Sequence, residues 1–359
     1  MYIDINILQS VPSSNINRDD TGAPKTAVYG GATRGRVSSQ SWKRATRLAF
    51  ERGGFENAMR TRMMPQLLLD RVNGKDAKDA EAKVEAAMNV FTKVENGQTK
   101  ELVFITPRQL DDLADYLNGI SDIKAATKST APKGSPKPKD VFAENVIRIL
   151  GGDSTLDMAL FGRMVANQTV LNVEAASQVA HAISTHAVES ELDYFTAVDD
   201  KNTNGAGFIT SQGFNSATLY RYANIDFEQL KANLGGSGED AVKGAIEFIK
   251  DFTLSMPTGK QNSYANKTLP SYIMVTLRPD MPVNLVGAFE KPVESEEGYD
   301  EASIAPLENE YNDTLTLTAK PLATFVWTKH DTELADAARE DSLRELLDDV
   351  KDELDHAIA

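Results

Sequence analysis

The stretch around which the chain is organised covers residues 15–47 and reads NINRDDTGAPKTAVYGGATRGRVSSQSWKRATR. It begins as a polar loop and ends with the composition of a helix. Ser38 and Ser39 are natural N-cap residues, because a serine oxygen can accept a hydrogen bond from a backbone N–H group of the first helical turn. The stretch therefore predicts a loop that leads into a helix from Gln40 to Phe50.

The two faces of this predicted helix differ in chemistry. Trp42, Ala45 and Ala49 recur at helical spacing and can face a core. Lys43 and Arg47 are four residues apart and share another face. Together with the positive end of the helix dipole, these cations suit a nucleic-acid backbone, which proteins hold through its phosphates without reading bases. The alternative is a solvated basic helix face.

The same stretch contains a partial match to the phosphate-binding loop G-x-x-x-x-G-K-[ST], at residues 30–37. Arg36 stands in place of the lysine, and Val37 stands in place of the Ser or Thr that would hold magnesium. We therefore reject nucleotide hydrolysis at this loop and interpret its glycines as hinges.

Length and composition limit the number of domains and the classes of protein to which the chain can belong. The 359 residues are enough for a substantial core and about two domains. The absence of cysteine excludes disulfides and thiolate metal sites. The N-terminus lacks a signal-peptide pattern, and no apolar run approaches the ~20 residues of a membrane span. We therefore expect a cytoplasmic protein with no membrane partner and no cofactor.

The net charge of −15 argues at first sight against nucleic-acid binding. Residues 290–359 carry 20 Asp and Glu against 6 Lys and Arg, a net charge of −14, so the rest of the chain is close to neutral. Residues 1–52 carry 8 Lys and Arg against 4 Asp and Glu. Because local charge sets the field at a groove, the basic N-terminal region remains a candidate binding region.

The N-terminal residues predict a sheet domain. Ile3, Ile5 and Ile7 alternate with polar residues, which indicates a half-buried strand from Tyr2 to Gln9. A strand followed by a helix suits an α+β fold. No aromatic motif of the RNA-recognition type is present, so we do not expect bases to stack on the sheet.

Residues 53–150 are expected to form a helical insertion. Residues 76–91 read as one helix, residues 106–119 as a second that starts with Thr-Pro, and Asp140 caps a third that ends at a Gly-Gly pair. Residues 124–139 contain five lysines, three prolines and no acid. This segment is either a solvated linker or a mobile arm that contacts phosphates.

The middle of the chain carries further patterns. Apolar residues alternate within residues 154–166, which predicts a strand, and apolar spacing predicts a helix over residues 172–188. His181 and His186 would lie five residues apart on that helix and so on different faces, which favours structural roles over metal binding.

Residues 195–222 predict a long hairpin with a polar turn at residues 201–205, where Asn and Gly tolerate positive φ. Phe208 and Ile209 follow the turn, so apolar side chains would stand near an exposed tip unless they pack against the body of the chain.

The C-terminal part predicts alternating elements and one more candidate site. We expect a strand at 220–225, helices at 226–234 and 239–256, a strand at 271–277, and an acidic amphipathic helix or helix pair within 332–358. Lys260, Gln261 and Asn262 lie in a loop bounded by Gly and Pro and form a second candidate phosphate contact.

Catalytic candidates are scarce. Asp19 and Asp20 are paired acids in the basic loop. They are either the centre of a metal-dependent RNA endonuclease or partners of Arg18 or Arg34 that hold the shape of the loop. We favour the structural role, because no further metal-ligand residues lie nearby in the sequence.

Several motifs in a fixed order resemble one family. They are NRDD (17–20), YGG (29–31), RVSSQSWKRA (36–45), FGRM (161–164), HAISTH (181–186), DYFTAVDD (193–200), YRYANI (220–225) and AFEK (288–291). Together they resemble the CasC backbone subunits of the type I-E CRISPR surveillance complex Cascade, which belong to the Cas7 group. The match is poor over residues 53–150 and at the C-terminal end.

This resemblance implies an α+β fold with a ferredoxin-like, RRM-like core. The core, or palm, would comprise residues 1–52 and 216–330, and the helical fingers residues 53–150. Residues 151–215 would hold a strand, a web helix and the protruding hairpin, or thumb. Residues 331–359 would form the acidic C-terminal helix.

The implied function is non-catalytic binding of CRISPR guide RNA (crRNA). The implied partners are crRNA, a target DNA strand, copies of the chain in a helical filament and other Cascade subunits. The thumb would wedge the neighbour's RNA through Met164, Phe195 and Ile209, which fall on the family's kink-forming positions. The candidate RNA-contacting residues are Arg18, Lys25, Ser38, Gln40, Lys43, Arg44, Arg47, Met164, Phe195, Phe208, Ile209, Lys260, Gln261 and Asn262. Lys133, Lys137 and Lys139 are possible DNA contacts.

Two other functions stay open from the sequence. One is the metal-dependent endonuclease centred on Asp19 and Asp20, since related type III backbone subunits cut RNA with an acid in a comparable loop. The other is a generic single-strand binding protein. Co-purified nucleic acid would separate the guide-binding function, which requires a uniform short RNA, from the generic one.

Overall fold

The computed structural model describes residues 1–131, 136–201 and 205–358. The chain forms two compact units. The first comprises Met1–Gly53, Ser177–Glu228 and Gly238–Ala359, and the second comprises Gly54–Ala176 and Gln229–Ser237. The finer division into palm, fingers, thumb and tail stays an interpretation.

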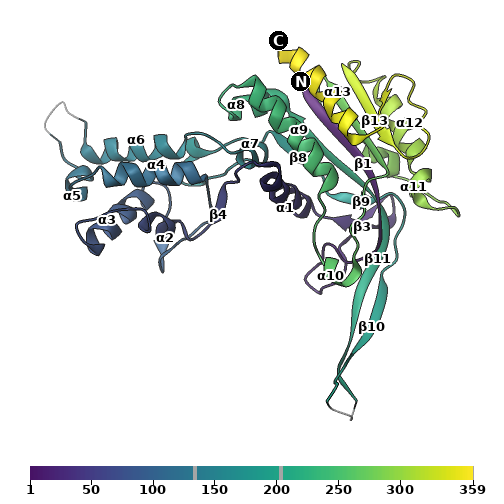
Figure 1. Ribbon diagram of the computed structural model, residues 1–359, viewed down its shortest axis with the longest axis horizontal. Helices are drawn as coiled ribbons and strands as arrows, with labels where there is room; N and C mark the ends of the chain where they lie inside the picture. Colours follow the sequence, from purple (N-terminus) through teal and green to yellow (C-terminus); the bar gives the residue numbers. More distant parts are fainter. Residues whose placement is uncertain (132–135, 202–204, 359) are drawn as a thin grey trace. The chain divides into compact units, whose positions relative to one another are not determined.

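The first unit is built on a ten-stranded sheet (Figure 1). Its strand order is β14-β13-β12-β1-β11-β9-β3-β2, and β8 and β10 also pair with β11. The strands are β1 (Tyr2–Ser14), β2 (Thr26–Tyr29), β3 (Ala32–Val37), β8 (Ser177–Val179), β9 (Ala182–Ser184), β10 (Glu191–Val198), β11 (Ala206–Asp226), β12 (Tyr272–Arg278), β13 (Ala323–Thr328) and β14 (Ala338–Arg339). With the helices below, this sheet confirms the predicted α+β class.

Helices cover both faces of this sheet. The helices are α1 (Ser39–Phe50), η1 (Glu51–Gly53), α9 (Gly238–Leu254), α10 (Gln261–Tyr264), η3 (Leu285–Phe289), α11 (Tyr299–Ala302), α12 (Ile304–Thr314) and α13 (Leu343–Ile358), and α8 (Phe227–Asn233) begins in this unit. On one face, α1 and α13 both pack against α9. On the other, η3 and α12 enclose a core with Leu8, Tyr220 and Met274.

The predicted half-buried strand is wrong in length and in burial. It extends to Ser14, and its polar residues Asp4 and Asn6 are as buried as the isoleucines. The reason is that helices cover both faces of the sheet, so the polar side chains are paired inside it. The Asp4 carboxylate accepts from Arg278 Nε at 2.7 Å and from Tyr222 Oη at 2.7 Å.

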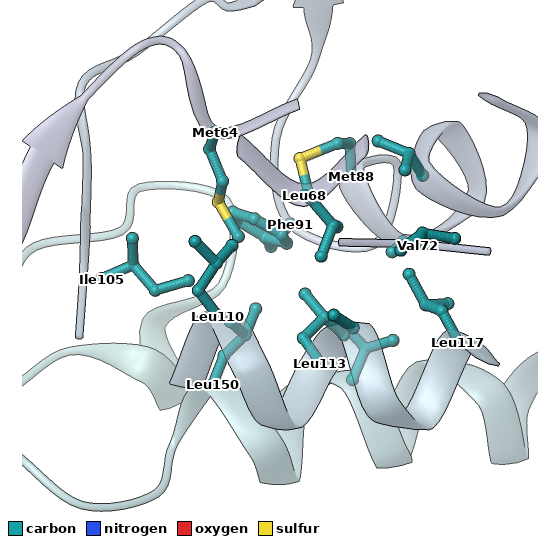
Figure 2. Close-up of a cluster of buried hydrophobic side chains, with 14 of the residues drawn as sticks. Met64, Leu68, Val72, Met88, Phe91, Ile105, Leu110, Leu113, Leu117 and Leu150 are labelled. Carbon is teal, nitrogen blue, oxygen red and sulfur yellow. The ribbon is translucent and has the colours of Figure 1, made fainter. Parts of the chain in front are cut away.

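The second unit is mainly helical, as predicted for the insertion. It contains α2 (Met64–Leu69), α3 (Ala77–Met88), α4 (Pro107–Asn118), α5 (Ile123–Ala126), α6 (Pro138–Leu150), α7 (Leu156–Phe161) and η2 (Thr169–Leu171). Two short ribbons accompany them, β4 (Met59–Thr61) with β7 (Val103–Ile105) and β5 (Val94–Glu95) with β6 (Gln98–Thr99). Figure 2 shows buried side chains of α2, α3, α4 and α6 pointing toward one another to form the core.

Local capping signals explain where these helices begin. Thr106 Oγ1 accepts from the Gln109 N–H and the Gln109 side chain accepts from the Thr106 N–H, a capping box that starts α4 as predicted. Asp76 caps α3 by accepting from the Asp79 N–H. The third helix differs from the prediction, since α6 begins at Pro138 and Asp140 lies in its first turn instead of at its N-cap.

Two middle segments have the opposite secondary structure to that predicted. The expected strand within 154–166 contains α7, whose alternating pattern is misleading because Asp157 and Ala159 are buried as well. The expected web helix at 172–188 contains β8 and β9. These strands pair with β11, and β9 also pairs with β3, so remote partners override the local apolar spacing.

The predicted hairpin is present as β10 and β11, which pair antiparallel and extend away from the sheet (Figure 1). One continuous strand, β11, belongs both to the sheet and to the hairpin. Its C-terminal half is buried between β1 and β9, and its N-terminal half is the exposed hairpin arm. The C-terminal acidic segment contains one helix, α13, preceded by the short strand β14.

Candidate nucleic-acid interface

A groove of 580 Å³ lies within the first unit, and we name it the α1 groove. One wall comes from α1 and the residues that follow it, and the other from the loop between α9 and β12. The lining residues are Ile16, Ser41, Arg44, Ala45, Leu48, Glu51, Arg52, Ser255, Met256, Pro257, Thr258, Gly259, Gln261 and Lys267. Three cations, the Glu51 carboxylate, hydroxyl and amide groups and an apolar surface therefore line one groove.

A second hollow of 520 Å³, which we name the loop hollow, adjoins this groove. It is lined by residues 16–22 and Gly259, and it shares Ile16 and Gly259 with the α1 groove. A Cβ atom on Gly259 would lie 2.2 Å from the Ile16 carbonyl oxygen, so the two backbones approach as only glycine permits. This contact brings Arg18 next to the cations of the α1 groove.

Burial of Trp42 fixes which face of α1 meets the groove. The Trp42 ring is fully buried, and the Arg221 guanidinium lies 3.8 Å from its centroid. Burial lowers the pKa of Arg221 to about 9. With this face inside, Ser41, Arg44 and Leu48 turn toward the groove.

The α1 groove is lined by a different cation of α1 from the pair that the spacing suggested. Arg44 lines the α1 groove, whereas Lys43 and Arg47 are half-buried and do not line it. Burial lowers the pKa of the Lys43 ammonium. The spacing of Ser41, Arg44 and Leu48 along the helix, away from the predicted core residues Trp42 and Ala49, could have identified this face.

The start of α1 is held by side chains from other segments. Ser38 occupies the N-cap position as predicted, but its side chain does not cap the backbone and lies 3.2 Å from Ser41 Oγ. The Ser38 N–H donates to Asn17 Oδ1 at 2.8 Å, and the Ser39 N–H donates to His181 Nδ1 at 3.2 Å. Gln40 is exposed in the first turn.

His181 contributes to a basic cluster that the sequence did not reveal. Its Nδ1 lies 3.4 Å from Arg36 Nη1. Partial burial lowers the pKa of His181, and the charges of Arg36 and Lys25 lower it further. The Lys25 carbonyl oxygen accepts from the Arg36 N–H at 2.9 Å, so Lys25 lies beside Arg36, outside both the α1 groove and the loop hollow.

His186 has the structural role that was predicted for it. Its Nε2 accepts from the Thr218 N–H at 3.1 Å, and its Nδ1 lies 2.8 Å from the Ala187 carbonyl oxygen. The ring stacks on Tyr299 with centroids 3.7 Å apart.

Asp19 organises the loop hollow, though with other partners than those predicted. Its carboxylate accepts from Thr21 Oγ1 at 2.7 Å, from the Thr21 N–H at 2.9 Å and from the Ala23 N–H at 3.0 Å. These hydrogen bonds, led by that of the Thr21 hydroxyl, lower the pKa of Asp19. The expected partner Arg34 is instead fully buried and donates to the carbonyl oxygens of four residues, Ser184, Thr185, Phe289 and Glu290.

In the part of the chain that the structure describes, no group of three or more His, Cys, Asp or Glu side chains is arranged to hold a metal ion. Within the same residues, no helix is long and apolar enough to cross a membrane.

The second predicted phosphate loop reaches the groove through one of its three residues. Gln261 lines the α1 groove, while Lys260 and Asn262 do not. Residues 261–264 form the one-turn helix α10 instead of a loop, and Lys260 before it has a left-handed φ of 53°. Lys267, which was not predicted, supplies the cation of this wall.

The hairpin exposes apolar side chains on both of its faces. Phe195 pairs with Thr210 and lies on the face of Phe208, with ring centroids 6.2 Å apart. Ile209 pairs with Thr196 and therefore lies on the opposite face. The exposed fractions are 38% for Phe195, 55% for Phe208 and 61% for Ile209, so these side chains are not covered by the body of the chain.

The remaining candidate residues belong to the second unit. Met164 follows α7 and is 85% exposed. Lys137 precedes α6 and Lys139 lies in its first turn, both exposed. Lys133 lies outside the described residues.

Comparisons with known proteins agree over nearly the whole chain. The family model of the CT1975-like proteins matches residues 3–353. A chain of a solved "CRISPR RNA-guided surveillance complex, pre-nicking" is similar, with a TM-score of 0.85 and 31% identity over 98% of this chain and 99% of that one. A chain of another solved "CRISPR RNA-guided surveillance complex" has a TM-score of 0.77 and 29% identity over the same shares. No curated protein matches the sequence. The chain therefore belongs to the CT1975-like protein family and is a Cas7-family protein.

Proposed function

We propose that this protein is a non-catalytic crRNA-binding subunit of a CRISPR surveillance complex. The observation that carries the proposal is the α1 groove, which is lined by Arg44, Arg52 and Lys267 and built from the motif stretch at residues 36–45. Similarity over 98% of the chain to subunits of RNA-guided surveillance complexes supports the same function.

The groove has the chemistry of a site for a single-stranded backbone. Guanidinium and ammonium groups neutralise phosphates, and the Ser41 hydroxyl and Gln261 amide can donate to phosphate or sugar oxygens. None of these contacts distinguishes bases, so a guide of any sequence fits. The loop hollow, with Arg18, continues the path.

Several copies of the chain would polymerise along one guide as a helical filament and present its bases to a target DNA strand. The hairpin reaches the RNA on a neighbouring copy, and its apolar residues on both faces separate the bases there. Lys137 and Lys139 contact the target DNA. We further propose that the assembly is the type I-E Cascade and contains other Cascade subunits.

We do not favour RNA cleavage at Asp19 and Asp20. The Asp19 carboxylate already accepts three hydrogen bonds that shape its loop. Its expected role is to hold the loop hollow open beside Arg18.

The first experiment is extraction of nucleic acid from the protein purified from its own cells. A uniform short RNA supports guide binding. Heterogeneous strands would favour a generic single-strand binding protein, and metal-dependent cutting of RNA that Asp19→Ala plus Asp20→Ala abolishes would favour the nuclease.

The second experiment tests the groove itself. Arg44→Glu plus Lys267→Glu should weaken binding of all RNA sequences alike and reduce the slope of log Kd against log salt by about 0.7 for each lost phosphate contact. The matched control is Lys320→Glu plus Arg344→Glu, two exposed cations of the first unit that do not line the groove. Equal slopes for the two double variants would rule out the α1 groove as the phosphate site.

A further inference from the structure

The base of the hairpin is tied to the loop that lines the loop hollow. Asn15 is fully buried, and its Nδ2 donates to the Gly22 carbonyl oxygen at 3.0 Å and to the Gly213 carbonyl oxygen at 2.8 Å. Gly22 lines the hollow, and Gly213 lies in β11 where it pairs with β10. One buried amide therefore holds both the binding loop and the hairpin.

Packing at Gly213 reinforces this link. A Cβ atom at this position would lie 3.1 Å from Pro24 Cδ and 3.7 Å from Ala23 Cα. The loop that contains Arg18 thus rests directly on the backbone of the hairpin, and a side chain at Gly213 would push the two apart.

The wall of the α1 groove that contains Gln261 also contacts the base of the hairpin. The Tyr264 ring lies 6.1 Å from the Phe214 ring in β11, measured between centroids. Tyr264 ends the one-turn helix that begins with the groove residue Gln261, and this turn lies between two left-handed non-glycine residues, Lys260 and Ala265. Such conformations are uncommon and persist where the surroundings hold them.

We propose that Asn15 is a positioning residue that couples RNA in the groove to the direction of the hairpin, and so sets the cooperativity with which successive copies bind one RNA. This inference rests on the proposed function, because it requires RNA in the groove and a neighbouring copy beneath the hairpin. A hairpin fixed at its base loses less conformational freedom when it docks, which strengthens the contact between copies.

The test compares two isosteric substitutions in the full-length protein. Asn15→Asp replaces the donor between two carbonyl oxygens with a carboxylate oxygen, which they repel. Asn224→Asp is the matched control, because Asn224 is buried in the other half of β11, and its Nδ2 donates to Gln178 Oε1 and Tyr222 Oη. Both variants are titrated with a short uridine oligomer that holds one copy and with a long one that holds several.

Asn15→Asp should reduce the affinity per copy on the long oligomer about tenfold more than it reduces the affinity for the short oligomer, since tenfold is the usual size of a coupling between sites. Asn224→Asp should leave the ratio of the two affinities unchanged. A purely structural role for Asn15 predicts an unchanged ratio for the folded fraction of both variants, and that result would overturn the proposal.

If Asn15→Asp does not fold, Gly213→Ala tests the same link, with an expected loss of about threefold on the long oligomer only. An unchanged ratio in that variant also overturns the inference. If the wild-type protein binds neither oligomer, the proposed function is refuted. If the wild type binds cooperatively and both Asn15→Asp and Gly213→Ala retain that cooperativity, this inference alone is refuted.

Discussion

Two helices of the first unit, α1 and α13, pack against the same helix, α9, and present opposite charges to solvent. The buried stripe of α1 contains Trp42 and Ala49, and its groove face carries Arg44. The buried stripe of α13 contains Leu346, Val350 and Leu354, and its exposed face is mainly acidic. An acidic protein can thus keep a basic groove, because 20 of its 53 Asp and Glu lie in residues 290–359, none of which lines the groove.

The two helices also begin differently. The N–H groups of the N-cap Ser38 and of Ser39, the first residue of α1, donate to side chains from remote segments, Asn17 and His181. The start of α13 is capped by a neighbouring residue, since Ser342 Oγ accepts from the Glu345 N–H at 3.2 Å. A binding helix whose start depends on the rest of the fold is positioned by that fold, whereas α13 carries its own signal.

The largest expected effect is on the anchor of α1. Trp42→Ala should lower the free energy of unfolding by about 3–5 kcal/mol, because it empties a buried site and leaves the Arg221 charge without the ring beneath it. Leu346→Ala in α13 should cost about 2–5 kcal/mol. Urea unfolding of both variants measures the two values. A smaller loss for Trp42→Ala than for Leu346→Ala would contradict this ranking.

The second prediction concerns α9, which lies between the two helices. Burial, together with the charge of Glu247, raises the pKa of Asp251 to about 6, while Lys250 and Arg52 oppose the shift. The folded state therefore favours protonated Asp251, and this contribution is present below the unfolded value of 3.8 and is lost as pH rises through about 6.

Asp251→Asn should consequently stabilise the protein near neutral pH by on the order of 2 kcal/mol, and by less at mildly acidic pH. Unfolding in urea across this pH range measures the difference. A stabilisation by Asp251→Asn that grows as pH falls would mean that the pKa of Asp251 is lowered in the folded state and not raised.

The third prediction uses the two charged faces. Arg44→Ala plus Arg52→Ala should weaken RNA binding about tenfold, because both cations line the α1 groove. Asp348→Asn plus Asp352→Asn on α13 should change it by less than about twofold, since these exposed carboxylates do not line the groove and salt screens them. Titration of one labelled RNA with both variants tests this. Equal effects would indicate that the net charge, and not the groove, controls binding.

The smallest expected effect concerns the helix starts. Ser342→Ala should destabilise the protein by about 1 kcal/mol, because it removes a side-chain cap. Ser38→Ala should cost less than about 0.5 kcal/mol, because the Ser38 side chain caps no backbone group. Thermal unfolding of the two variants ranks them. The reverse order would show that the start of α1 depends on Ser38 after all.

Features with a local cause were predictable from the sequence. The Thr-Pro start of α4 acts through neighbouring residues, so this helix was identified. The hairpin of β10 and β11 was identified as well, and residues 202–204 of its expected turn lie outside the described residues. The error at 154–166 arose because Asp157 and Ala159 are buried along with the apolar residues, and the error at 172–188 has a remote origin. Ser177 pairs with Ile225, and no local pattern encodes a partner that far along the chain.

In the candidate site, too, residues with local signals were predicted and residues placed by remote contacts were missed. Arg18, Arg44 and Gln261 were predicted, because basic and polar residues in two loops and a helix suggested phosphate contacts. Lys267 and His181 were missed, because their place depends on the approach of segments from distant parts of the chain, such as Ile16 against Gly259. The buried face of α1 was predicted correctly at Trp42 and Ala49, whereas Ala45, expected on the same face, lines the groove.

The pairing of β1 with strands far along the chain has a consequence for biosynthesis. Tyr2 pairs with Asp226 in β11 and with Arg278 in β12, so both edges of β1 stay open until more than 200 further residues have been made. At ordinary translation rates this lasts on the order of 10 to 40 seconds. The helical second unit, with its core drawn from residues 64–171, emerges within that interval and can fold first. The nascent chain therefore carries an unpaired apolar strand together with a helical core from residues 64–171, and protection of that strand is a condition for productive folding.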